Sequence, residues 1–500
     1  MSLLRSGVYN LAGALLPAVV LFVTVPVIVH RLGAEAYGAL VLITSIVGYF
    51  GILDVNAHAG TVKYVAEHHA RTEDDRVAQV VTTGALLHAA LGLTGACLLW
   101  VLAPWLVDVV FRFDLGWRAE ALAALRWSAV AFVVGQLQQW LQSLPQALQR
   151  YDITGRLDAL FGTLIPLATL VAVLAGGALV AIVVARLVLS GLHALLLARA
   201  VSALLPALRP ARPDGVTVRA LVAFSAWSWL QRLAALTTAN ADKLLIGAQQ
   251  SVLALAAYVI PYTLCSRVFG LLYRLQQAVF PLSSALAASD NLAALKGSSV
   301  RLQRCTLYLN VALCLLCALF AKELLHYWLH GQPSDASALV LVLVSYTLMA
   351  DSLTHVPSLV NDGLGRPRLT ATAALLRAGI GLAAAAAALT WGDIVWLAAS
   401  QLLVSVAMAL GFLRVVHRRS LPWTLGEVAR PVYALNAAVL AVGTALLLWR
   451  WHGPVLDPLA FALALGVASA LLAVVGWRLV LQGDERQRLG AAWRGVLGTR

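Results

Sequence analysis

Charge is scarce in this 500-residue chain: only 12% of its residues are charged, whereas 61% are hydrophobic and the mean hydropathy is +0.84. A soluble domain carries about 25% charged and 45–50% apolar residues. The composition therefore excludes an ordinary soluble protein and predicts a polytopic membrane protein. The five cysteines lie in or beside apolar segments, which excludes a disulfide framework and favours buried thiols.

The chain also lacks the motifs that carry common enzyme chemistry. The stretch GLGRP at 363–367 has no Lys-Ser/Thr pair after it, so it does not match the Walker phosphate loop. No Ser-His-Asp order accompanies a nucleophile turn, and no large loop holds paired carboxylates. We predict that the protein is not an enzyme, does not hydrolyse ATP, and holds neither a metal nor a cofactor.

Apolar runs long enough to cross a membrane fill the chain. A helix of about 20 apolar residues spans a bilayer, and about fourteen such runs are present. The first is longer than the core of a signal peptide, so we expect it to be a retained span. The fold prediction is an all-α membrane protein. Its expected spans are 8–30, 37–57, 78–104, 120–143, 157–177, 178–200, 219–243, 252–280, 302–325, 336–360, 368–390, 392–413, 430–449 and 456–481.

Lysine and arginine predict the orientation of these spans. Most of the 36 basic residues fall on the side that holds both termini, and cytoplasmic loops are the ones enriched in Lys and Arg. Both termini are therefore expected in the cytoplasm. The net charge of +13 is assigned to the membrane surface, and no nucleic acid is expected as a partner. The opposite side keeps Arg31, Arg112, Arg118, Lys322 and Arg450.

A basic, proline-rich stretch, LLPALRPARPDGVTVRAL, separates the first six spans from the next six. The segment LGAEAYGALVLI before the second span weakly matches IGAQQSVLALAAYVI before the eighth, where a six-helix duplication would place it. The expected division is a six-helix lobe at 1–210, a second at 211–420, and two further spans with a basic tail at 421–500.

About six basic residues are expected at membrane depth, and four arginines among them are candidates for a substrate cavity. Arg186, Arg232 and Arg267 fall near the midpoints of predicted spans, and Arg274 follows Arg267 by about two helical turns. A guanidinium in hydrocarbon costs on the order of 2.5–3.5 kcal/mol, so such residues line cavities or bind partners. We predict a cationic cavity at these positions. For Arg274, snorkelling to the inner interface is an equal alternative.

Four further residues form a second group of candidates, for gating or ion coupling. Asp54 and Asp351 are carboxylates at membrane depth, where a proton or cation can bind. Asp242 and Lys243 lie near the outer end of the seventh span. The alternatives are structural hydrogen bonds for Asp54 and Asp351 and an outer-interface anchor for Asp242 and Lys243.

Several stretches in fixed order resemble the polysaccharide or oligosaccharidyl-lipid flippases, relatives of the multidrug and toxic-compound extrusion transporters and the peptidoglycan lipid flippases. They are VYNLAGALLPAVVLFVTVPVIVHRLGAEAYGAL, GILDVNAHAGTVKYVAEHHA, ADKLLIGAQQSVLALAAYVIPYTLCSRVFGLLYRLQQAVFPLSSAL and LVNDGLGRPRLTATAALL. Asn56 and Lys63 depart from the family's usual glycine and arginine. The resemblance covers about the first 415 residues, and the last two spans fit the fourteen-helix members.

The resemblance implies two pseudo-symmetric six-helix lobes around a central cavity. It also implies alternating access that moves an oligosaccharide on polyprenyl (undecaprenyl) diphosphate to the outer leaflet of a bacterial inner membrane. This transport would serve O-antigen or exopolysaccharide synthesis, with a polysaccharide polymerase and chain-length machinery downstream. Because no ATP hydrolysis is expected, the drive is predicted to come from an ion gradient (proton or sodium), from the membrane potential or from downstream use of the product. A multidrug or cation antiporter of the same superfamily is the first alternative, and a membrane glycan polymerase or ligase is the second.

Overall fold

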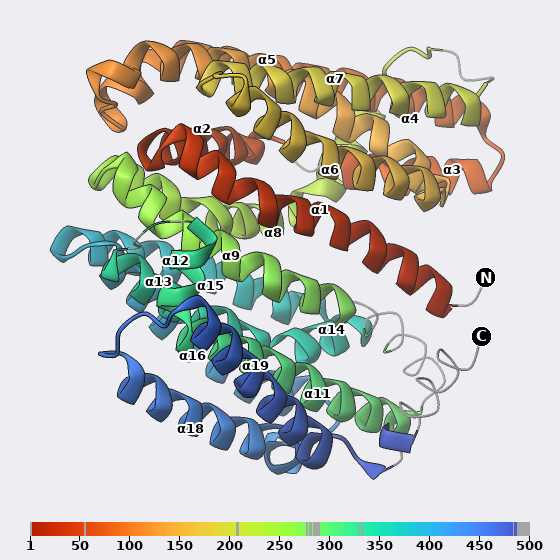
Figure 1. Ribbon diagram of the computed structural model, residues 1–500. Helices are drawn as coiled ribbons and strands as arrows, with labels where there is room; N and C mark the ends of the chain where they lie inside the picture. The colour runs from red at the N-terminus through yellow and green to blue at the C-terminus, as the bar shows by residue number, and fades with distance from the viewer. Residues whose placement is uncertain are drawn as a thin grey trace, which may run out of the picture. The chain divides into compact units, whose positions relative to one another are not determined.

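The computed structural model describes residues 3–54, 57–206, 210–276, 279, 283, 291–329, 331, 334–483 and 485–487. Every regular element among these residues is helical (Figure 1). In the first half they are α1 Leu3–Leu32, α2 Ala34–Phe50, η1 Gly51–Leu53, α3 Ala57–Ala70, α4 Asp74–Trp105, η2 Leu106–Val110, α5 Leu115–Ala147, α6 Tyr151–Leu174, α7 Leu179–Leu204, α8 Gly215–Gln249 and α9 Val252–Gln276. In the second half they are α11 Leu292–Leu319, α12 Ala321–Leu329, α13 Asp335–Ser352, α14 His355–Gly363, α15 Pro367–Trp391, α16 Ile394–Arg419, α17 Leu425–Val428, η3 Ala429–Ala434, α18 Leu435–Arg450, α19 Pro458–Val475 and η4 Gly476–Val480.

The described residues include twelve helices that are long and apolar enough to cross a membrane. Two further helices, α1 with 30 residues and α8 with 35, occupy the remaining predicted spans. The prediction of an all-α protein with about fourteen spans is confirmed. The adjoining spans at 157–177 and 178–200 are separate helices, because α6 ends at Leu174 and Gly176 takes φ +80°, which ends the helix.

The chain forms two compact units. The N-terminal unit comprises residues 1–259 with 374–397, and the C-terminal unit comprises 260–373 with 398–500. The expected lobe boundaries near residues 210 and 420 stay a prediction.

In the N-terminal unit α5 packs against α4 and α7, and α6 packs against α1 and α7 (Figure 1). Leu144 of α5 and Leu197 of α7 are completely buried, and they belong to a core that α3, α4 and α8 complete. Only a minority of the residues in the apolar windows of α4, α5, α6 and α7 is buried within the protein. These long segments therefore present most of their surface to lipid.

Glycines bring α2 close to α8 and α9 within this unit. A Cβ on Gly38 would lie 2.2 Å from the carbonyl oxygen of Val252 at the start of α9, so the backbones meet only because residue 38 is glycine. A Cβ on Gly247 of α8 would lie 2.6 Å from the Leu42 side chain. Small residues permit such close helix contacts in membranes, which explains the AYG and IGA segments structurally.

In the C-terminal unit α11 is the central helix, since more of its apolar window is buried (61%) than that of any other candidate span among the described residues. It packs against α13, α18 and the end of α19. Tyr308 of α11 donates a hydrogen bond of 2.5 Å to the Leu472 carbonyl on α19. The apolar window of α19 has no buried residue, so this helix faces lipid over most of its surface.

The LVNDGLGRPRLT segment forms a polar connection between α14, α15 and α16. Gly365 takes φ +76°, a left-handed conformation that suits glycine. The buried Asn361 amide donates to the Arg366 carbonyl at 2.8 Å and to the Thr370 hydroxyl at 2.9 Å. Its oxygen accepts from the Ser420 hydroxyl at the end of α16. The motif therefore satisfies its own turn and ties that turn to a neighbouring helix.

Candidate functional site: a charged cluster in the N-terminal unit

An ion pair lies inside the N-terminal unit. Asp54 follows the η1 turn at the end of α2, where its backbone N–H donates to the Gly51 carbonyl at 3.3 Å. Its carboxylate is completely buried, and Oδ2 lies 3.2 Å from Nη1 of Arg232 on α8. The Trp229 indole, one turn earlier on α8, donates to the Ile52 carbonyl at 2.7 Å and joins α8 to the η1 turn.

Arg232 uses its second amino group on a different element. Nη2 donates to Oε1 of Gln139 on α5 at 3.2 Å. The Arg232 side chain is 28% exposed, whereas the Asp54 side chain has no exposure. The guanidinium thus joins α8 to η1 and α5 and still keeps an accessible surface. A permanent cation with an open face can bind an anionic group.

Two histidines lie near this ion pair. His58 of α3 contacts the Gln139 carbonyl through Nδ1 at 2.9 Å and Oε1 of Gln146 through Nε2 at 3.0 Å. His88 of α4 is buried, and its Nδ1 lies 2.8 Å from the Gly84 carbonyl. Asp54, His58 and Arg232 all interact electrostatically with His88. The charged cluster therefore draws on α3, α4, α5, α8 and η1.

Several buried polar atoms of this cluster lack partners. Neither Asp54 oxygen accepts a well-aligned hydrogen bond from the described residues. Nε2 of His88 likewise has no hydrogen-bond partner in the described part of the chain. An unsatisfied buried polar group costs about 1–3 kcal/mol, so several together point to a site that takes up water, a proton or a ligand group.

Arg186, a second predicted cavity residue, lies elsewhere in the same unit. Its Nε donates to the Thr169 hydroxyl of α6 at 3.0 Å, and the guanidinium interacts electrostatically with Tyr37 of α2. Its side chain is half-buried. Arg186 therefore bridges α6, α7 and α2, and it does not touch the Asp54–Arg232 pair in any contact that the structure shows.

Asp242 joins α8 to α9, and the ammonium of the adjacent Lys243 bonds within α8. Asp242 accepts from the Tyr258 hydroxyl of α9 at 2.8 Å and from the Lys243 backbone N–H at 2.8 Å. The Lys243 ammonium donates to the Ala239 carbonyl on its own helix. The Asp242–Tyr258 hydrogen bond holds α8 against α9.

The remaining candidates belong to the C-terminal unit. Arg267 is exposed on α9, whereas the Arg274 side chain lies outside the described residues. Asp351 is half-buried at the end of α13, and its carbonyl accepts from the Thr354 hydroxyl at 2.8 Å. Of the eight predicted site residues, the structure brings Asp54 and Arg232 into an ion pair.

Known proteins resemble this chain in sequence and in fold. A family model described as polysaccharide biosynthesis protein matches residues 27–338. The chain belongs to this family. A putative O-antigen transporter from Shigella flexneri is 27% identical over 112 residues, which are 22% of this chain. That match spans only a quarter (25%) of the length of the relative.

Two solved structures resemble the fold of this polysaccharide biosynthesis protein. An inward-facing multidrug resistance MATE family transporter of the MOP superfamily superposes with a TM-score of 0.69 at 12% identity, covering 85% of this chain and 99% of its own. The lipid II flippase MurJ, in an inward closed conformation, gives 0.68 at 11% identity and covers 96% and 100%. The protein is a multi-pass membrane protein of the polysaccharide biosynthesis family, and its fold is similar to that of these two transport proteins.

Several polar residues inside the helical units were not among the predicted site residues. His58, His88 and Gln139 belong to the charged cluster, and Arg377 lies half-buried on α15. The signal was present: His88 and Arg377 interrupt predicted spans, and Gln139 belongs to the glutamine-rich segment GQLQQWLQ in another. Amides and imidazoles at membrane depth, like charged groups, are expensive without partners, so these residues are candidates on the same physical ground.

Proposed function

We propose that this protein is a flippase for lipid-linked oligosaccharides. It carries a polyprenyl-diphosphate-linked repeat unit from the cytoplasmic to the outer leaflet of the bacterial inner membrane, for synthesis of surface polysaccharide. The observation that carries the proposal is Arg232, whose side chain is 28% exposed inside an apolar bundle. The polysaccharide biosynthesis family and the O-antigen transporter relative support the same substrate class.

The chemistry of Arg232 suits a diphosphate. Its planar fork can donate two parallel hydrogen bonds to phosphate oxygens, and its charge is permanent. Asp54 Oδ2 lies 3.2 Å from Nη1 of Arg232 and neutralises this charge. The incoming headgroup displaces Asp54 from Arg232, and the released carboxylate takes up a proton or sodium ion. This exchange couples substrate binding to an ion gradient.

Transport follows alternating access, with both termini in the cytoplasm. Arg267, exposed on α9, also binds the headgroup, and Arg186 contributes charge in the N-terminal unit. Arg274, whose side chain lies outside the described residues, is retained as a predicted contact of the headgroup. Asp242, Lys243 and Asp351 act in gating, and the released product passes to a polysaccharide polymerase and chain-length machinery. The prenyl tail stays in lipid during the cycle.

A multidrug exporter is the second candidate, because the fold resembles the MATE transporter as closely as it resembles MurJ. An exporter of organic cations needs an accessible carboxylate. In the charged cluster the reverse holds, since the Asp54 carboxylate is completely buried and the Arg232 guanidinium is the exposed partner. This polarity favours an anionic substrate.

The test is a transport assay in liposomes with a labelled polyprenyl-diphosphate oligosaccharide. We expect Arg232→Ala to lower the initial rate by at least about 10-fold, and Arg267→Ala to have a similar effect. Arg232→Lys keeps the charge but loses the planar pair of donors, so its rate should lie between those of the wild type and Arg232→Ala. Surface glycan export in cells gives a second readout.

The control is Arg71→Ala, which removes a 59% exposed arginine paired with Glu67 on the α3–α4 turn and should leave the rate unchanged. Export of organic cations instead of the lipid-linked glycan would establish the second candidate. Wild-type transport by both Arg232→Ala and Arg267→Ala, with normal protein levels, would refute the cationic site.

A further inference from the structure

His58, in the first turn of α3, is held between two glutamines of α5. Its Nδ1 lies 2.9 Å from the Gln139 carbonyl oxygen, and its Nε2 lies 3.0 Å from Oε1 of Gln146. Because a carbonyl oxygen can only accept, Nδ1 carries a hydrogen in either charge state of the ring. His58 is half-buried, so part of the residue stays accessible. Any change of charge on His58 therefore takes place at Nε2, beside Gln146.

Gln146 is a suitable partner for both charge states of His58. In the neutral ring Nε2 accepts a hydrogen bond, and in the imidazolium it donates one. A half-turn of the Gln146 amide presents either its NH₂ group or its oxygen to Nε2, so the hydrogen bond is kept in both states. His58 can therefore gain or lose a proton without leaving a polar group unsatisfied.

His88, the other histidine of the charged cluster, has no such partner. It is completely buried, and its Nδ1 donates to the Gly84 carbonyl at 2.8 Å. Its Nε2 has no hydrogen-bond partner among the described residues. A proton there would create a buried charge whose second N–H lacks an acceptor in the described part of the chain, which is costly. Of the two histidines, His58 is the one placed to change charge.

The surroundings of His58 connect its charge to Arg232. Gln139 contacts both residues, since its carbonyl accepts from His58 and its Oε1 accepts from Nη2 of Arg232 at 3.2 Å. α3 packs against α4, α5 and α8, and α5 presents neutral amides to His58. The next basic residue on α3 itself is Lys63, five positions on and on another side of the helix. The charged or titratable groups that α4, α8 and η1 bring to the cluster are His88, Arg232 and Asp54.

The charge of the cluster depends on whether His58 carries a proton. Asp54 lies 3.2 Å from Arg232 and neutralises it, so this pair by itself offers little net charge to a diphosphate. A proton on His58 adds a positive charge beside the pair. Binding of the proton and binding of the anion are then linked: each raises the affinity for the other by the same factor.

We propose that His58 is a protonation switch that controls the affinity of the Arg232 site for a diphosphate group. The inference rests on the function proposed above only in taking Arg232 as the contact of the diphosphate. A proton from water binds the lone pair of Nε2 when the anion binds, and it returns to water when the anion leaves. The protonated cluster holds the diphosphate, and the neutral cluster releases it.

The test measures the affinity of the full-length protein in detergent for inorganic pyrophosphate, by isothermal titration calorimetry. The measurements are made at about pH 5 and about pH 8, the limits of the range in which histidine usually changes charge. Pyrophosphate also changes charge in this range, so the quantity compared is the ratio of variant to wild-type dissociation constants at each pH. We expect His58→Gln to weaken binding about 10-fold at the lower pH and by less than about 2-fold at the higher pH.

Three further variants locate the effect. Arg232→Ala should abolish binding, which places the probe at the charged cluster. His69→Gln is the matched control, because it makes the same substitution at an exposed position of the same helix, and it should bind like the wild type at both pH values. His88→Gln tests the second histidine of the cluster, and any change in its affinity should be equal at both pH values.

Equal weakening by His58→Gln at both pH values would mean that the ring only supports the fold, and it overturns the switch. The same conclusion follows if His69→Gln or His88→Gln shows the pH-selective loss. It also follows if Arg232→Ala binds pyrophosphate like the wild type, or if the wild type binds none.

Gln146→Met covers the case in which His58→Gln does not fold. It leaves the ring in place and removes the oxygen that the imidazolium needs as acceptor. It should weaken binding at least about 3-fold more at the lower pH than at the higher pH, and the absence of this difference overturns the proposal.

The probe contains neither lipid nor sugar, and no transport is measured. A pH-selective loss in His58→Gln therefore supports the switch even if the liposome assay refutes the flippase. Its absence refutes the switch and leaves the flippase proposal standing.

Discussion

At the residue scale, the pairing of Asp54 with Arg232 explains how each charge is tolerated inside the bundle. Arg232 is a cation inside an apolar bundle, and Asp54 is a carboxylate with no exposure. Each alone would carry a large desolvation cost, and together at 3.2 Å they offset much of it. Sequence reasoning gave them separate roles, one in substrate binding and one in ion coupling. As an ion pair, they can serve both substrate binding and ion coupling only if the substrate replaces Asp54 as the partner of Arg232.

Removing one member of this pair should cost more than removing both. We expect Asp54→Asn and Arg232→Gln each to lower the melting temperature of the detergent-purified protein. The double variant should recover part of the loss, with a coupling energy of about 1–3 kcal/mol. Strictly additive losses in this double-mutant cycle would mean that the pair contributes no stabilising interaction.

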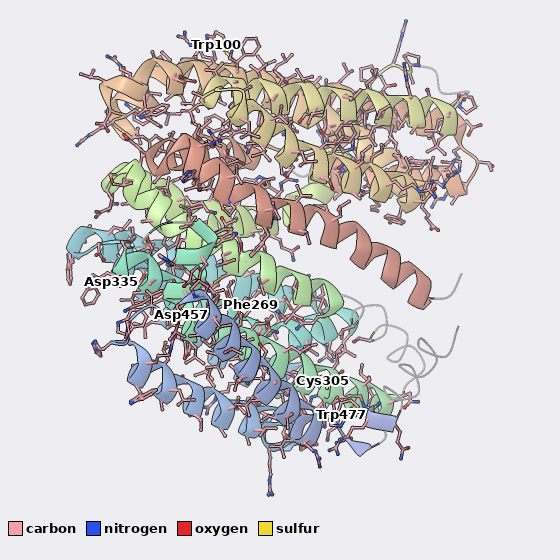
Figure 2. All side chains as sticks on the ribbon, in the orientation of Figure 1. Trp100, Phe269, Cys305, Asp335, Asp457 and Trp477 are labelled. Atoms are coloured by element: carbon pink, nitrogen blue, oxygen red, sulfur yellow. The ribbon has the colours of Figure 1, made fainter. Side chains whose placement is uncertain are left out.

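Arg126 shows how a cation at membrane depth can be accommodated without a carboxylate. Its guanidinium lies 5.3 Å from the ring of Trp100, which is labelled at the edge of the N-terminal unit in Figure 2. A cation over an aromatic face gains about 0.5–2 kcal/mol. The aromatic contact therefore offsets part of the cost of the Arg126 charge, whereas Arg232 contacts polar partners.

At the scale of elements, close backbone contacts hold the N-terminal unit together. Gly38 allows α2 to meet the start of α9, and Gly247 allows α8 to meet α2. Both contacts occur where apolar helices have no hydrophobic drive to associate in lipid, so packing and shape must supply the stabilisation.

A single methyl group should distinguish such a contact glycine from an ordinary one. At Gly38 a Cβ would lie 2.2 Å from a backbone oxygen, whereas at Gly135 in α5 nothing lies within 4 Å. We expect Gly38→Ala to lower the melting temperature and the folded yield on size exclusion. Gly135→Ala should be neutral or stabilising by about 0.5–1 kcal/mol, because alanine is the better helix former. Equal behaviour of the two variants would contradict the packing argument.

At the scale of the whole molecule, charge assigns the sidedness of the bundle. In the N-terminal unit the α3–α4 and α5–α6 turns carry Arg71, Arg76, Arg150 and Arg156, whereas the segment before α5 carries Arg112 and Arg118. Arg118 is also neutralised by Asp108 at 2.7 Å. The positive-inside rule predicts that the first set lies at the cytoplasmic end.

Cysteine labelling in whole cells checks this orientation. Asp75 and Gly116 are exposed at opposite ends of the N-terminal unit, and a background of Cys97→Ser and Cys305→Ser removes the accessible native thiols. With the outer membrane permeabilised, an impermeant maleimide should label Gly116→Cys and leave Asp75→Cys unlabelled until the cells are lysed. The reverse pattern would place the termini outside.

The predicted and observed elements agree where the signal is local. Each predicted span coincides with a long helix, including the pair at 157–177 and 178–200, because about 20 consecutive apolar residues suffice to specify a membrane helix. The buried cluster was only partly predictable. His58, His88 and Gln139 lie on three different helices, and no local pattern shows that they meet Asp54 and Arg232.

By itself, the sequence determined that this is a polytopic α-helical membrane protein, where its helices lie along the chain, and which family it resembles. Hydropathy, loop charge and motif order are properties of short segments, so no tertiary contact is needed to find them. Only the tertiary structure decided that Arg232 pairs with Asp54 and that His58 meets Gln139 and Gln146 of α5. These partners lie far apart along the chain, and the packing of the helices in the N-terminal unit brings them within reach.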